Sequence, residues 1–121
     1  MKLFRIGCAV AATLAVVTMA KADEAAEKLI DEALPQMYHT CASLTKLADG
    51  DDDVVLDVLG KITAISIYMR KIDIESYGFS DSEKAEARAR FFQAVSEGCA
   101  ADENSLLAGV VDNAVKVALD L

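Results

Sequence analysis

The stretch DDVVLDVLGKITAISIYMRKI, residues 52–72, decides the fold class of this chain. Its large apolar residues recur every three or four positions, the period of one face of an α-helix. Acidic residues begin the stretch and Arg70 and Lys71 end it, which matches the polarity of a helix dipole. The β-branched run from Ile62 to Ile67 favours a strand instead, but the helical period persists over several turns and outweighs it. We therefore predict a helix over residues 52–72, the longest and most buried of the protein.

Two shorter helices are predicted on the N-terminal side of this segment. Residues 23–34 are rich in Ala and acidic residues at helical spacing, and Pro35 ends them, so residues 23–36 form either a loosely attached helix or a tail. Thr40 is a suitable N-cap for the next helix, which Gly50 terminates. The apolar face of that helix is formed by Cys41, Leu44, Leu47 and Ala48.

Two more helices are predicted on the C-terminal side, after a loop at residues 75–79. The sequence Ser80-Asp81-Ser82-Glu83 is a capping box, and it opens a helix that we expect to end at Glu97. Its predicted apolar face is Ala85, Ala89, Phe92 and Val95, continuing to Cys99. Asp102 is the predicted N-cap of a last helix with a broad apolar stripe from Leu107 to Leu121. The chain should therefore be an all-α, compact bundle of four to five helices.

The first 22 residues have the order of a secretory signal peptide. A basic start at Lys2 and Arg5 precedes an apolar run, and Ala20-Lys21-Ala22 supplies the small residues that a signal peptidase requires. The run is shorter than the ~20 residues of a membrane-spanning helix, although an uncleaved anchor is the alternative. We expect cleavage after Ala22, export to the periplasm, and a single helical domain over residues 23–121.

Export changes how the three cysteines are interpreted. Cys8 is removed with the signal peptide, which leaves Cys41 and Cys99 in an oxidising compartment. Two cysteines allow a single internal pairing, so we predict a Cys41–Cys99 disulfide. The alternatives are two free thiols or an intermolecular bridge.

Charge excludes several classes of partner. Loss of Lys2, Arg5 and Lys21 leaves nine of the 12 basic residues against all 20 acidic ones, a net charge of −11. Such a surface repels nucleic acid and anionic lipid headgroups. We expect neither a nucleic-acid partner nor a membrane partner once the signal peptide has been removed.

No pattern of catalytic or metal-binding residues is evident in the sequence. Asp49, Asp51 and Asp53 alternate as in a calcium loop, but Val54 and Gly60 stand where an EF-hand requires Gly and Glu. His39 is the only histidine, which leaves no second base for a triad, and we expect it to be partly exposed. We therefore predict a protein without a cofactor, a metal or an enzymatic activity.

A set of residues spread over the exported chain resembles the small periplasmic YmgD-like family. The matching positions are Leu34-Pro35, Tyr38, Thr40-Cys41-Ala42, Cys99-Ala100, Asp102, Leu107, Asp112 and Ala118. That family is similar in fold to the acid-stress chaperone HdeA. The resemblance implies a compact HdeA-like helical domain with one disulfide.

Two hypotheses about function follow. In the first, the protein is an acid-stress holdase: near pH 2 its carboxylates become neutral, its net charge approaches about +11, and the loosened domain exposes apolar residues to unfolded periplasmic proteins. In the second, it is an acidic stoichiometric binder, an immunity or inhibitor protein that binds a basic periplasmic or cell-wall enzyme. Assembly as a homodimer is compatible with both. The candidate client or partner surface is formed by Val55, Leu59, Ile62, Ile65, Met69, Leu107 and Val111.

Overall fold

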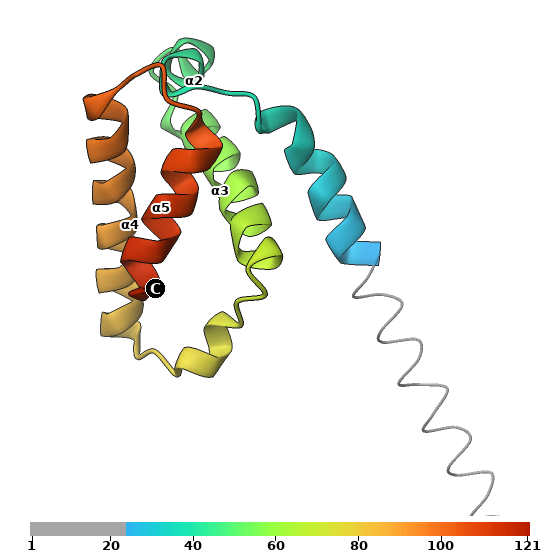
Figure 1. Cartoon of the computed structure of the whole chain (residues 1–121), viewed down its shortest axis with the longest axis vertical. Helices are drawn as coiled ribbons and strands as arrows, with labels where there is room; N and C mark the ends of the chain where they lie inside the picture. The colour runs from blue at the N-terminus through green and yellow to red at the C-terminus, as the bar shows by residue number, and fades with distance from the viewer. Residues whose placement is uncertain (1–23) are drawn as a thin grey trace, which may run out of the picture.

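A computed structural model describes residues 24–121 and confirms an all-helical fold in this part of the chain (Figure 1). The predicted signal peptide and its cleavage site lie outside the described residues. A helix over residues 24–33 comes first, and Ala33 at its end is fully buried. The elements that follow are η1 (Leu34–Gln36), α2 (Cys41–Ala48), α3 (Asp52–Met69), η2 (Ile74–Tyr77), α4 (Asp81–Ala101) and α5 (Leu107–Leu119).

Helix α2 begins and ends where the sequence predicts. The Thr40 side chain accepts a hydrogen bond from the Ser43 backbone N–H, and the Ser43 hydroxyl accepts one from the Thr40 N–H. This reciprocal pair satisfies two N–H groups that the first helical turn leaves without partners. At the other end, Asp49 and Gly50 both have positive φ, which terminates the helix.

Helix α3 starts at Asp52 as predicted but ends at Met69, three residues earlier than expected. Lys71 adopts a left-handed conformation, and the N–H of Ile72 donates to the carbonyl of Ile67. These features form a Schellman motif, which stops the helix while its apolar residues continue into the turn. The prediction that this helix is the longest is wrong, because α4 has 21 residues against 18. It is also not the most buried, since α5 buries five of its 13 residues.

Helix α4 has the predicted capping box, but it continues past Glu97 to Ala101. Gly98 lies inside the helix, where a Cβ would be 2.9 Å from Cγ1 of Val110, so glycine permits the close approach of α5. The predicted apolar face is wrong in its first half, because Ala85 and Ala89 are exposed and Ala87 is buried. Every second residue from 85 to 89 is alanine, and helical geometry selects the one that lies four residues before Phe91.

The start of α5 corrects the prediction that Asp102 is its N-cap. Asp102 is instead the C-cap of α4, and its carboxylate accepts a hydrogen bond from the Asn104 N–H. Leu106 precedes α5 without a capping side chain, and the N–H of Leu107 donates to the carbonyl of His39, 2.8 Å away. A backbone group from the segment before α2 thus replaces the side-chain cap.

The helices pack as an antiparallel bundle that α2 closes at one end. Helix α4 is antiparallel to α5 and to α3, and α5 lies between them in Figure 1 with extensive contacts to α4. The loop that we expected at residues 75–79 is helical in part, because it overlaps the short helix η2 (Ile74–Tyr77), which lies between α3 and α4 at the opposite end. The buried core includes Leu44, Val58, Leu59, Ile62, Val95, Leu107, Val111 and Val115.

Candidate functional site

The end of the bundle near α2 is fixed by covalent and backbone links. The predicted Cys41–Cys99 disulfide is confirmed, with 5.5 Å between the two Cα atoms, and it joins the start of α2 to the end of α4. The N–H of Cys41 also donates to the carbonyl of Ser105 in the loop before α5. His39 is 5 % exposed, with Nδ1 3.0 Å from the Ser43 hydroxyl, so the expectation of a partly exposed histidine is wrong. These links hold the start of α2, the end of α4 and the loop before α5 together.

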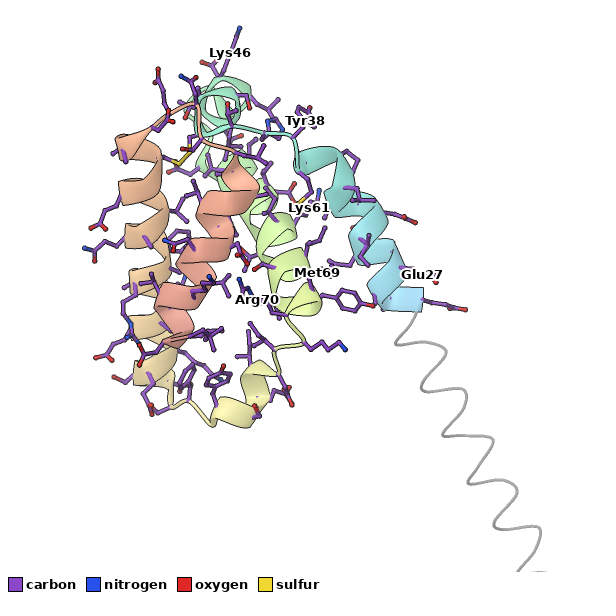
Figure 2. All side chains as sticks on the ribbon, in the orientation of Figure 1. Glu27, Tyr38, Lys46, Lys61, Met69 and Arg70 are labelled. Carbon is purple, nitrogen blue, oxygen red and sulfur yellow. A yellow bond between two sulfur atoms is a disulfide. The ribbon has the colours of Figure 1, made fainter. Side chains whose placement is uncertain are left out.

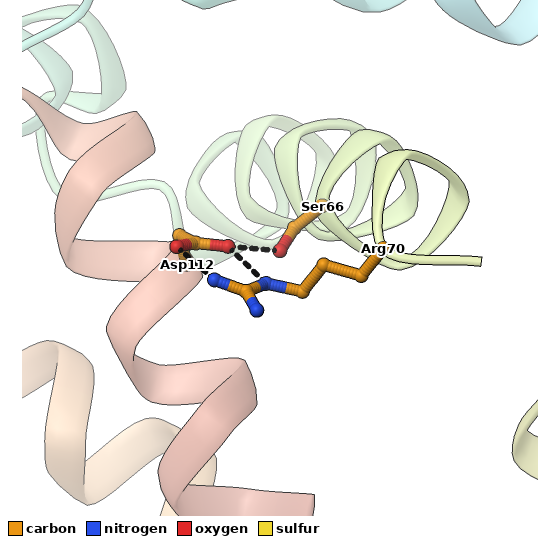
Figure 3. A network of polar contacts seen from close by, with 3 residues as sticks. All are labelled: Ser66, Arg70 and Asp112. Atoms are coloured by element: carbon orange, nitrogen blue, oxygen red, sulfur yellow. Dashed lines mark hydrogen bonds and ion pairs between the residues drawn. The ribbon is translucent and has the colours of Figure 1, made fainter. Parts of the chain in front are cut away.

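A polar cluster farther along the bundle joins α3 to α5 (Figure 3). Both nitrogens of an Arg70 fork donate to Asp112, from Nε to Oδ1 and from Nη2 to Oδ2, each at 2.7 Å. The Ser66 hydroxyl donates to Oδ1 of the same carboxylate at 2.8 Å. Ser66 and Arg70 are four residues apart and therefore lie on one face of α3.

These hydrogen bonds change the acidity of Asp112. Arg70, then Ser66, favour the charged carboxylate and lower the pKa of Asp112 to about 2. Nearby Lys116 acts in the same direction. The same contact raises the pKa of Arg70, so that residue stays charged. Asp112 therefore remains ionised in moderate acid and is protonated in strong acid.

Most of the predicted client or partner surface lies inside the folded protein. Leu59, Ile62, Ile65, Leu107 and Val111 are buried, and Val55 is half-buried against the core. Met69 is 71 % exposed at the end of α3 (Figure 2). The buried members of this set can contact another protein only after the helices separate, whereas Met69 is accessible in the folded bundle.

A cavity of about 550 Å³ opens between α3, α4 and the C-terminal part of α5. Its wall is mainly apolar, with Leu59, Ile67, Phe91, Phe92 and Val115 among the lining residues. The α4 residues that line it belong to the first half of that helix, so the cavity lies away from the disulfide. The volume falls in the range of about 300 to 1,000 Å³ that is usual for small-molecule sites.

The cavity has few polar lining residues, and those that carry a charge are basic. Lys84 and Arg88, both on α4, are its charged lining residues. The Thr63 hydroxyl is buried in the wall and has no hydrogen-bond partner among residues 24–121. Buried hydroxyl groups are nearly always paired, so this one is unusual, but its oxygen exposes less than 1 Å² and is covered by neighbouring atoms.

The described residues contain neither a candidate metal site nor a candidate membrane-spanning helix. No group of three or more His, Cys, Asp or Glu side chains in residues 24–121 is arranged to hold a metal ion. No helix in the same part of the chain combines the length and the hydrophobicity needed to span a membrane.

Comparison of the chain with protein-family models, with curated proteins and with solved structures gave no match.

The polar cluster that joins α3 to α5 was not predicted from the sequence. Asp112 interrupts the apolar stripe of the last helix, and Ser66 is a polar residue within the apolar face of α3. Each interruption was a signal that a polar contact lay in the interface. The two helices are not adjacent in sequence, however, so the partner of each residue could not be assigned. The cavity itself left no signal, because its walls are ordinary apolar helix faces.

Proposed function

We propose that this protein is exported to the periplasm and acts there as an acid-activated chaperone of the holdase type. The observation that carries the proposal is the link between α3 and α5 through Asp112, whose pKa is about 2. Its folded pKa is lower than in the unfolded chain, so its contribution to stability is complete above about pH 4. The contribution is lost as the pH falls through about 2.

Acid also changes the charge of the whole molecule. The 20 carboxylates that keep the exported chain at −11 become neutral, and the basic residues bring the net charge near pH 2 to about +11. Repulsion among these cations then opposes a compact state at the same pH at which the Asp112 link weakens. Separation of α3 from α5 would expose Leu59, Ile62 and Val111, which are buried at neutral pH. These residues supply the apolar surface that a holdase needs to bind an unfolded client.

The test measures light scattering by a client enzyme that aggregates in acid, with and without the purified oxidised protein, from pH 7 to pH 2. The wild-type protein should suppress aggregation below about pH 3, while an apolar dye reports exposed core residues over the same range. Asp112→Asn should shift both transitions to higher pH. Asp57→Asn is the matched control, because Asp57 pairs with Lys61 within α3 and its carboxylate is 61 % exposed. That variant should behave like the wild type.

A protein that stays fully folded at pH 2, binds no dye and leaves the client insoluble would contradict the proposal. The acidic stoichiometric binder would then take its place. Its support is the charge of −11 and the exposed Asp49, Asp51 and Asp53 at the turn between α2 and α3. A pull-down from a periplasmic extract at pH 7 would recover a basic enzyme in a fixed ratio if this second function is correct.

A further inference from the structure

We infer that the cavity between α3, α4 and α5 binds a long-chain carboxylate, a free fatty acid, in the folded protein at neutral pH. The alkyl chain lies along the apolar wall, and the carboxylate contacts Lys84 and Arg88. This goes beyond the proposed holdase function, because it concerns the closed form of the bundle and a cavity that acid opening would destroy.

The cavity wall is mainly apolar and is therefore suited to an alkyl chain. Phe91, Phe92, Val115 and Leu119 contribute large apolar side chains to a space of about 550 Å³. The cavity is open to solvent on one side, where its lining residues Leu56 and Ile74 are 43 % and 41 % exposed, so part of its apolar wall is in contact with water. A flexible alkyl chain lying along this wall covers the exposed apolar surface and removes its own surface from water.

A glycine borders the cavity on its exposed side. Gly60 is an interior residue of α3, where glycine is less favourable than alanine by about 1 kcal/mol. It lines the cavity, and no atom lies within 4 Å of the position that its Cβ would take. Gly60 therefore does not serve the close packing of two helices, as Gly98 does. It is solvent-exposed at the edge of the cavity, so a large side chain introduced there can extend over the open space.

The positive charge of Lys84 and Arg88 decides which end group the ligand carries. The ion pairs of the described residues are Lys28–Glu32, Lys61–Asp57 and Arg70–Asp112, so neither Lys84 nor Arg88 has a carboxylate partner there. Arg88 lies over the ring of Phe92, 5.5 Å from its centroid, which places a guanidinium next to the apolar wall. In a chain of 20 acidic residues, two cations without an acid among the lining residues select an anionic head group. The same pair disfavours an alkylammonium ion.

The experiment is calorimetric titration of the purified oxidised protein at pH 7 with laurate, dodecanol and dodecyltrimethylammonium, each below its micellar concentration. We expect laurate to bind in a one-to-one ratio, dodecanol more weakly, and the ammonium compound not measurably. Myristate should bind about tenfold more tightly than laurate, because each buried CH₂ group adds apolar contact of known strength.

Two variants separate head-group recognition from binding of the chain. Lys84→Gln combined with Arg88→Gln should weaken laurate binding roughly tenfold and leave dodecanol binding unchanged. Arg90→Gln is the control, since it removes a cation from the same helix at a position that does not line this cavity. Gly60→Leu should reduce binding of laurate and dodecanol alike by filling the open space. Its folding is checked by circular dichroism, and leucine favours the helix more than glycine does.

Laurate binding that is unchanged in the double variant, or matched by dodecanol in the wild type, would overturn the assignment of the head group. Laurate binding that persists in a folded Gly60→Leu protein would overturn the assignment of the cavity. Failure of these tests leaves the acid-activated holdase proposal standing, because that proposal is measured in acid on an unfolded client.

Discussion

Replacing Asp112 with Asn tests the main polar link between α3 and α5. The substitution keeps the size of the side chain and removes its charge. The drop in pKa from the ordinary 3.8 to about 2 corresponds to at most about 2.5 kcal/mol of stability at neutral pH. The Asp112 side chain is 40 % exposed, so solvent screening reduces the expected loss in Asp112→Asn to about 1 kcal/mol.

The pH dependence of this loss is what distinguishes charge from packing. The folded pKa is depressed, so the carboxylate stabilises the protein above the unfolded pKa of about 4. That stabilisation disappears as the pH falls through about 2. Wild type and Asp112→Asn should therefore differ by about 1 kcal/mol at pH 7 and converge near pH 2.

Urea unfolding followed by circular dichroism at pH 7, 4 and 2 measures this difference, with Asp57→Asn as the control for loss of one exposed carboxylate. Thermal unfolding at pH 7 should show a decrease of roughly 4 to 8 °C in Tm for Asp112→Asn. An equal deficit at pH 7 and pH 2 would refute the electrostatic argument and assign the effect to altered packing. No deficit at pH 7 would show that the link does not stabilise the bundle.

Three further substitutions test other parts of the fold. Cys99→Ser should cost about 2 to 5 kcal/mol in the free energy of unfolding, measured in urea beside the oxidised wild type. Gly98→Ala should destabilise the protein by about 1 to 3 kcal/mol, because its Cβ would be 2.9 Å from Val110; Gly109→Ala, with nothing within 4 Å, should be neutral or stabilising. Equal Tm values for the two glycine variants would contradict that argument. Thr40→Ala should cost about 1 kcal/mol through loss of its N-cap, and an unchanged urea midpoint would refute this.

Local chemistry explains which parts of the fold could be predicted. Thr40 and Ser80 begin helices through hydrogen bonds within four residues, so their role is visible in the sequence. The disulfide followed from a simple elimination, because the predicted signal-peptide cleavage leaves two cysteines. The boundary between α4 and α5 was predicted wrongly because it depends on a longer-range contact. Asp102 was assigned to the wrong helix because the first N–H group of α5 finds its partner on His39, far away in the sequence.

The functional features were harder to predict for the same reason. The ionic link requires Ser66 and Arg70 on α3 to face Asp112 on α5, and no sequence pattern states which helices are neighbours. The cavity depends on how three helices are placed relative to one another, which apolar periodicity does not encode. Sequence patterns thus predicted the helices and the disulfide. The polar contacts and the cavity depend on how the helices are arranged in space, which those patterns did not show.

In the acid-activated holdase that we propose, the disulfide also bears on how quickly the protein returns to its compact state after acid is neutralised. Cys41 and Cys99 are 58 positions apart, and their bond remains intact in any opened form. The search that normally slows folding is the closure of long loops, whose entropy must be lost before distant contacts form. Here the contact between the start of α2 and the end of α4 is already made when refolding begins. Repeated cycles of opening and closing can therefore proceed without the chain having to find that contact again.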